Sequence, residues 1–296
     1  MDLVGLGWRP EIAPAILSHL DQIDVVEVIL DDYFNASSTK LRSLRTLSVQ
    51  TPVVYHGVGL GLATSFKLNP KRLQNLKRVL DYLAPDTWSE HLAFVRAENI
   101  EIGHLASPPR NMQTVYGTLE NLELIKKVVG NCPALENVAT LIDPPHSSMS
   151  EPQWVSEILK GSGCNMLLDL HNLYSNAINF GFDPVVYLKS FPLDRVQLVH
   201  LSGGEWIQEP QGFESNLKGQ RLLDDHVHDI PEIVFDLLGV LGQFVEQPLT
   251  VIIERDGEYP EFQTLLNQIN RAKRTLKNAR EQRTSKMGGS PECTNI

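Results

Sequence analysis

Short apolar runs rich in β-branched residues alternate with amphipathic stretches along almost the whole chain. The runs that predict strands are LVGLG (3–7), VVEVIL (25–30), PVVYHGV (52–58), TWSEHL (87–92), ALENV (134–138), NMLLDL (165–170), RVQLVHL (195–201) and LTVIIERD (249–256). Between them, apolar residues recur at three- and four-residue spacing, as at Leu73, Leu76, Val79 and Leu80, which is typical of amphipathic helices. Eight strands alternating with helices predict an α/β protein with a single domain, the (β/α)8 TIM barrel.

The boundaries of this domain follow from where the alternation stops. The barrel is expected to occupy residues 1–282, and residues 283–296 are rich in small polar residues, so they predict a disordered polar C-terminal tail. A doubly wound open sheet is the structural alternative. It is disfavoured because the turn GLGWRPE after the first strand lacks the glycine spacing of a dinucleotide-binding fold. The long connection 202–248 is expected to build the site or its lid.

Polar side chains with metal-binding chemistry stand at the ends of several expected strands. Because parallel strands all point one way, side chains at their carboxyl ends meet at one mouth of a barrel. The residues at such positions are His56, His91, Glu136, Asp169, His171, His200 and Glu254. Asp224 and His226 lie in the long connection that leads to the same mouth, where a solvated loop explains them about as well. His19, His104 and His146 lie in helix or loop segments and are interpreted as structural.

Strand alternation refines this set. In LLDLHN, Asp169 and His171 are expected to share one face, so that one strand aims two ligands inward. In WSEHL, Ser89 and His91 share a face, whereas Glu90 points away and could support an imidazole.

Three further acidic residues are expected close to this mouth. Glu27 lies within a strand on the same face as Asp31, and a buried salt bridge explains it almost as well as catalysis does. Asp256 follows the last strand and is a plausible polar neighbour of the site. Together with Ser89 and Glu90, these residues are expected to support the ligands or to contact substrate.

The number of donors predicts more than one metal ion. A catalytic zinc takes three protein ligands plus water, whereas about four or five imidazoles and as many carboxylates are available here. A two- or three-metal centre is therefore the default, and mixed imidazole and carboxylate ligands suit iron, manganese or zinc. The chain has no GxSxG motif and no cysteine beside a strand-end histidine, which argues against nucleophilic hydrolases.

Composition excludes several other classes of function. The formal net charge of −10 argues against nucleic-acid binding, which needs basic surface. The sequence contains no apolar stretch of about 18 residues, so we expect no membrane span, and its first residues do not resemble a signal peptide. The three cysteines, Cys132, Cys164 and Cys293, form no CxxC pair and fit a cytoplasmic protein.

Ten ordered segments resemble the multinuclear non-haem iron-dependent oxidative enzymes, a family that was long known only as a domain of unknown function and that includes the oxidase maturing methanobactin peptides. The segments span about residues 4 to 262 and read GLGWRPE, VEVILDDYF, VVYHGVGLGL, WSEHLAF, LENV, LLDLHNLYSNA, GFDPVVYL, DRVQLVHLSGG, DDHVHDIP and IIERDGEYP.

The resemblance implies a TIM barrel with two or three iron ions in mixed Fe2+ and Fe3+ states. The ligand motifs of the family fall on His56, His91, Glu136, Asp169, His171, His200, Asp224, His226 and Glu254, and Asn172 is a further candidate. Asp169, His200 and Glu254 are the residues we expect to be catalytic. Known members use oxygen to remodel cysteine, or sometimes aspartate, in ribosomally made precursor peptides (RiPPs), commonly with a separate partner protein that recognises the leader segment.

This chain departs from the family pattern at three places. Many members carry Glu-Asn-Tyr where it has Asp31-Asp32-Tyr33, and asparagine where it has His171. Many also have a histidine where Gly204 ends the run HLSGG.

From the resemblance, the function expected from the sequence is an oxygen-dependent iron oxidase acting on a precursor peptide. The alternative is a divalent-metal hydrolase or isomerase, such as barrels of the endonuclease-IV and sugar-isomerase type. A metal-storing or peptide-binding barrel without catalysis is a third hypothesis.

Overall fold

Eight parallel strands close into a barrel in the computed structural model, which describes residues 1–97, 100–208 and 219–288. The barrel strands are β1 (Leu3–Gly7), β2 (Val26–Ile29), β3 (Val53–Gly57), β4 (Trp88–His91), β7 (Ala134–Glu136), β8 (Met166–Asp169), β9 (Val196–Leu201) and β12 (Thr250–Ile253). Their order around the barrel is β1-β12-β9-β8-β7-β4-β3-β2, and β1 pairs with β2 to close it. The predicted TIM barrel is confirmed.

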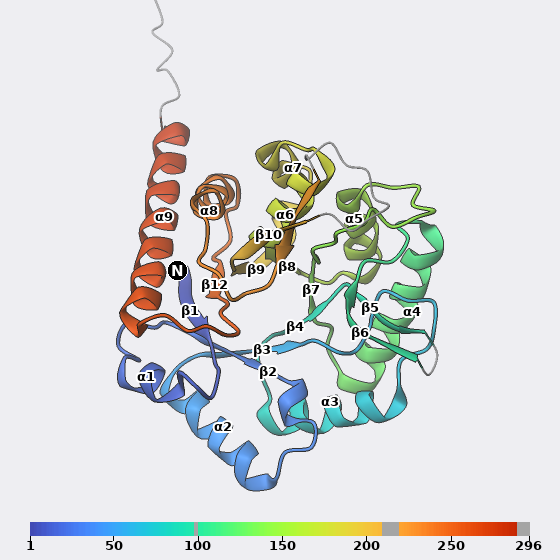
Figure 1. Cartoon of the computed structure of the whole chain (residues 1–296). Coiled ribbons are helices and arrows are strands. Elements are labelled where there is room, and N and C mark those ends of the chain that lie inside the picture. Colours follow the sequence, from blue (N-terminus) through green and yellow to red (C-terminus); the bar gives the residue numbers. More distant parts are fainter. Residues whose placement is uncertain (98–99, 209–218, 289–296) are drawn as a thin grey trace, which may run out of the picture.

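Helices surround the barrel strands, as Figure 1 shows. They are α1 (Ala13–Ser18), α2 (Ser38–Gln50), α3 (Pro70–Leu83), α4 (Met112–Val129), α5 (Glu151–Ser162), α6 (Leu170–Phe180), α7 (Pro184–Lys189), α8 (Glu232–Phe244) and α9 (Phe262–Gly288), with short 3-10 turns at η1 (Asp31–Tyr33) and η2 (Leu193–Arg195). The side chains of Asn69 and Ser150 cap the first turns of α3 and α5. Among the described residues, no helix combines the length and apolar character needed to span a bilayer.

Two layers of hydrophobic side chains stabilise the barrel. The larger cluster lies between the strands and the surrounding helices. A smaller cluster, from residues in or directly beside β2, β3, β7, β8, β9 and β12, consists of Val25, Val54, Ala134, Leu167, Leu198 and Ile252. Alternate residues of a barrel strand face the interior of the barrel. This smaller cluster therefore forms an apolar floor beneath the side chains that lie two residues further along each strand.

Two antiparallel hairpins stand outside the barrel and were not predicted. One pairs β5 (Phe94–Ala97) with β6 (Ile100–Ala106), and the other pairs β10 (Gly204–Gln208) with β11 (Gln220–Asp224). The second belongs to the long connection after β9. Asp224 is therefore the last residue of a strand, so its assignment to a loop was wrong.

Two face assignments made from strand alternation are also wrong. β8 ends at Asp169, which accepts a hydrogen bond from the backbone nitrogen of Asn172 and caps α6, so His171 lies in the first turn of a helix. Likewise β2 ends at Ile29, and Asp31 belongs to η1 instead of sharing a strand face with Glu27.

The C-terminal segment also differs from its prediction. Helix α9 continues to Gly288, which includes part of the stretch expected to be disordered. Residues 289–296 lie outside the described residues.

Candidate metal centre

The polar residues at the mouth of the barrel lie two positions further along their strands than the residues of the apolar floor. Glu27, His56, Glu136, Asp169, His200 and Glu254 each stand two positions beyond a residue of the apolar floor. Since side chains two residues apart point to the same face of a strand, all six point into the barrel one layer above the floor. Each of them is at most 5% exposed.

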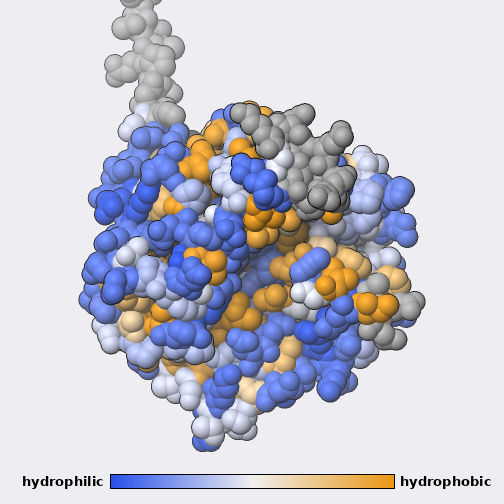
Figure 2. Space-filling model, in the orientation of Figure 1, coloured by the Kyte–Doolittle hydropathy of each residue, from blue (hydrophilic) through white to orange (hydrophobic). Residues whose placement is uncertain are grey.

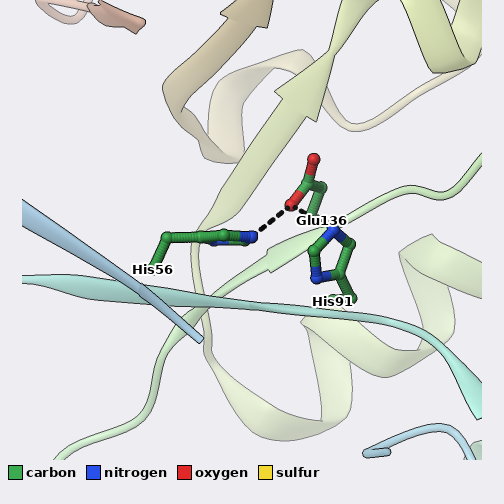
Figure 3. Close-up of side chains that lie close together, drawn as sticks. All are labelled: His56, His91 and Glu136. Atoms are coloured by element: carbon green, nitrogen blue, oxygen red, sulfur yellow. Dashed lines mark ion pairs between the residues drawn. The ribbon is translucent and has the colours of Figure 1, made fainter. Parts of the chain in front are cut away.

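Two of these donors, His56 and Glu136, form a first compact group with His91, drawn in Figure 3. The Nε2 atoms of His56 and His91 lie 3.3 and 3.2 Å from the same oxygen, Oε2 of Glu136. Ser89 supports this group, because its hydroxyl lies 2.8 Å from Nδ1 of His56 and so fixes the orientation of that ring.

A second compact group shares Glu136 with the first. It joins Glu136, Asp169, His200 and Glu254, whose ligand atoms lie within 4.8 Å of one another. Nδ1 of His200 lies 3.3 Å from Oε1 of Glu136 and 3.0 Å from Oε2 of Glu254. Its other nitrogen lies 2.9 Å from Oε2 of Glu27, which is fully buried. Glu27 thus orients His200 from behind.

Asp224 and His226 adjoin the second group on its outer side. Nε2 of His226 lies 2.8 Å from Oδ2 of Asp224, and its Nδ1 lies 3.7 Å from Glu254 and 3.2 Å from Asp256. Arg9 in turn binds Asp256 at 2.6 Å, so a short chain of polar contacts leads from this arginine to His226. His226 also has a left-handed backbone with φ of 57°, which is uncommon for a residue other than glycine.

His171 holds Asp224 and does not belong to either compact group. Its Nδ1 lies 2.6 Å from Oδ1 of Asp224, while its Nε2 is buried without a hydrogen-bond partner. A Cβ atom at Gly204 would lie 2.6 Å from Cε1 of His171 and 2.0 Å from the carbonyl oxygen of Leu223. A side chain at position 204 and the imidazole at position 171 therefore exclude each other, which links two departures from the family pattern.

Asn172 and Asn137 brace Asp169. Asn137 accepts from the backbone nitrogen of Asp169 at 2.9 Å and donates to its carbonyl oxygen at 3.0 Å. Asn172 donates to the carbonyl oxygen of Asn137 at 3.0 Å, which leaves Oδ1 of Asn172 buried and without a hydrogen-bond partner. The free oxygens of Asp169 and Asn172 remain available to a ligand.

Glu90 and Asp31 have other contacts. Glu90 accepts a hydrogen bond from the backbone of His91 at 3.2 Å, and burial raises the pKa of its carboxyl well above the ordinary value. Asp31 binds Arg72 at 2.9 Å and accepts from the backbone nitrogen of Val58. These contacts tie loops together beside the mouth and lie outside both compact groups.

The raised pKa values of Asp169 and His200 reflect a surplus of buried carboxylates in the centre. Burial raises the pKa of Asp169 well above its ordinary value, and the carboxylate of Asp224 adds to the rise. Burial alone would lower the pKa of His200, but Glu254 and Glu27 raise it well above the ordinary value. In the absence of another cation, protons therefore neutralise the cluster.

A metal ion fits these residues better than protons do. Several ligand-grade atoms are buried without a hydrogen-bond partner, namely Glu136 Oε2, Asp169 Oδ2, His200 Nδ1 and Glu254 Oε2. Buried polar atoms without partners are costly, and bound cations in the two groups would satisfy them. Mixed imidazole and carboxylate donors match iron, manganese or zinc.

A cavity of about 580 Å³ opens beside the centre. His91, Asn172, Asp224 and His226 line its inner end, and β6, the loop after β7 and β11 supply the rest of its wall. His104, interpreted from the sequence as structural, lies in this wall. His104 lies on the hairpin strand β6, which was not predicted, so no signal in the sequence pointed to this role.

A comparison of the sequence with models of protein families gives a match over nearly the whole chain. Residues 3–277 match the model of the RiPP precursor modification enzymes MbnB/TglH/ChrH. The chain belongs to this family. The resemblance to multinuclear iron-dependent oxidative enzymes seen in the sequence is thereby confirmed, and the family acts on ribosomally synthesised precursor peptides.

Similar chains occur in distant bacteria. A UPF0276 protein of Streptomyces avermitilis is 32% identical over 283 residues, which cover 93% of this chain and 55% of that protein. A UPF0276 protein of Acaryochloris marina is 30% identical over 269 residues, 90% of this chain and 92% of the relative. The chain thus spans about half the length of the first relative and nearly all of the second.

Solved structures share the fold at low sequence identity. A xylose isomerase domain containing protein from Salmonella typhimurium LT2 has a TM-score of 0.57 at 14% identity, with 94% of this chain and 99% of that chain covered. The 3-keto-D-glucoside 4-epimerase from E. coli has a TM-score of 0.56 at 10% identity, with 93% and 100% covered. These likenesses establish the barrel architecture alone.

Proposed function

We propose that this chain is an oxygen-dependent oxidase whose two or three iron ions, in mixed Fe2+ and Fe3+ states, modify residues of a ribosomally synthesised precursor peptide. The observation that carries the proposal is the position of Glu136. Its two oxygens face two different groups of buried donors, one with His56 and His91 and the other with His200. A carboxylate shared in this way suits a bridge between neighbouring metal ions.

The ligands fall into three neighbouring sets. His56, His91 and Glu136 would hold one ion, and Glu136, Asp169, His200 and Glu254 a second. Asp224 and His226 would hold a third together with Glu254, which lies between the second and third sets. His171 and Asn172 each keep one buried atom free and are the remaining candidate ligands.

Bound iron would supply the one-electron chemistry with oxygen that the side chains of a protein cannot perform alone. We assign Asp169, His200 and Glu254 as catalytic. They belong to the second ligand set, which lies between the first and the third, and would contact the metal held there. Glu27 and Ser89 orient the rings of His200 and His56, and Asp256 with Arg9 does the same for His226. Burial of the centre excludes bulk water from its inner side.

The substrate would reach the centre through the adjoining cavity and present a cysteine, or another residue such as aspartate. As the resemblance to the iron-dependent oxidative family implies, recognition of the leader segment is assigned to a separate partner protein. The described cysteines, Cys132 and Cys164, are free thiols, which supports a cytoplasmic setting.

The test combines metal dependence with a change in peptide mass. Protein purified without oxygen and supplied with iron would be mixed with a short precursor encoded near this chain, with and without a candidate partner. We expect oxygen consumption and a mass change of the peptide only with iron. Equal turnover by a zinc-loaded protein without oxygen consumption would favour the hydrolase or isomerase alternative.

A further inference from the structure

The cavity beside the metal centre has an uncommon chemical character for a site that adjoins so many charges. Away from the centre its wall consists mostly of aliphatic and proline side chains, among them Leu105, Val138, Leu141 and Ile142, with Ser107 and Thr140 as polar residues. In the view of Figure 2, hydrophobic surface borders the hollow in the middle of the molecule. The site therefore pairs a charged end with a long apolar wall.

Charged partners are missing from this wall among the residues that the structure describes. Apart from the candidate ligands, the ionisable lining residue is His104 on β6, and no described lysine, arginine or glutamate lines the cavity. Asp143 stands in the middle of the wall segment, but its carboxylate turns to Arg110 at 3.0 Å and does not line the cavity. A charged side chain packed against this part of the wall would lose water, and His104 is the ionisable neighbour that the described residues away from the centre offer it.

The wall is held in place before anything binds. In the loop after β7, the backbone nitrogen of Thr140 donates to Asn176 at 2.8 Å, and Asn176 donates to the carbonyl oxygen of Val138 at 2.9 Å. Arg110 fixes the outer part of the same loop through Ser147 and Asp143. A preformed wall lowers the entropy cost of binding and makes the cavity selective for shape.

We propose that this cavity binds an aliphatic or aromatic side chain of the precursor peptide that neighbours the residue reaching the metal centre. The inference rests on the proposed function, because it takes the inner end of the cavity as the place of reaction. A volume of about 580 Å³ holds one or two such side chains together with the peptide backbone. The cavity thus selects precursors by the apolar neighbours of the modified residue.

Three short peptides test this selection independently of oxidation. The probes are N-acetyl-Leu-Cys-Leu-amide and its analogues with alanine or aspartate in place of both leucines. They are titrated into the full-length chain with zinc in its centre, since zinc is diamagnetic and leaves methyl signals sharp. We expect the leucine peptide to bind at least about tenfold more tightly than the aspartate peptide, because burial of one leucine side chain favours binding by that factor or more.

Methyl signals locate the contact, and a matched pair of variants controls for surface hydrophobicity. The leucine peptide should shift the signals of Leu141 and Ile142 and leave that of Ile100, which is 71% exposed on β6 and does not line the cavity. The variant Ile142→Asp should abolish the preference for leucine, whereas Ile100→Asp should retain it. Equal affinities for the three peptides, including no measurable binding by any, would overturn the proposal.

These outcomes are separate from those of the function test. Selective binding with no iron-dependent mass change would leave the cavity assignment standing and reject the oxidase. Oxidation of a precursor with charged neighbours on both sides of the modified residue would reject the cavity assignment alone.

Discussion

Glu136 is the residue on which the account of the centre depends. It ends the shortest barrel strand, is 1% exposed, and lies within 3.3 Å of three histidine rings. A carboxylate buried among imidazoles in this way is a poor structural choice unless it is paired or binds metal, because desolvating a charge is costly.

Glu136→Gln should remove the bridge while preserving volume and burial. An amide does not bridge two cations, so we expect both adjoining sites to lose affinity by at least about a hundredfold, the upper end of what a supporting residue costs. Metal content per chain, measured after gel filtration, would show the loss. Glu90→Gln is the matched control, because this carboxyl is equally buried but contacts the backbone of His91. Full metal content in Glu136→Gln would contradict the bridging role.

Proton release on metal binding follows from the raised pKa values of Asp169 and His200. Burial raises the pKa of Asp169, and Glu254 and Glu27 raise that of His200, so in the metal-free centre both groups hold their protons to higher pH than usual and must lose them to act as ligands. Metal affinity should therefore increase as the pH rises through these raised pKa values. Calorimetric titrations in two buffers of different ionisation enthalpy would count the protons. Equal heats in both buffers would mean that these groups are already deprotonated.

The sequence predicted some secondary-structure elements, such as the barrel strands, and missed others. The ends of the barrel strands were predictable because apolar runs stop where His56, His91 and Glu136 begin the polar mouth. The helical start at Leu170 was missed, although Asp169 before an amphipathic stretch is a good N-cap signal. The two hairpins were missed because pairings between exposed segments such as 100–106 depend on contacts that single-strand patterns do not encode.

The β10–β11 hairpin should release its metal first. It pairs as a two-stranded sheet outside the barrel and carries Asp224, so its opening costs less free energy than that of the barrel strands. Graded chelation should remove one ion before the others. Asp224→Asn and His226→Ala should lack that first step and keep the rest, whereas Asp225→Asn, whose side chain contacts Val227 and His228, should behave as wild type. Loss of all ions in one step in every protein would refute a separate hairpin-held site.

In the whole molecule, the apolar residues that stabilise the barrel and the polar residues of the candidate metal centre occupy different layers along the barrel axis. The apolar floor and the outer cluster contain none of the residues that we assign to metal, although Asp169 also caps α6. The barrel could be predicted from the sequence because its alternation is regular over hundreds of residues. The grouping of donors around Glu136 could not, because it depends on distances between strands that are far apart in the sequence.

Metal stoichiometry with electron paramagnetic resonance tests the central claim most directly. Protein purified without oxygen should contain between two and three iron ions per chain and give a mixed-valence signal, since the buried donors form at least two groups that share Glu136. One equivalent of zinc per chain, with no iron bound on reconstitution and no mixed-valence signal, would contradict a multinuclear iron centre.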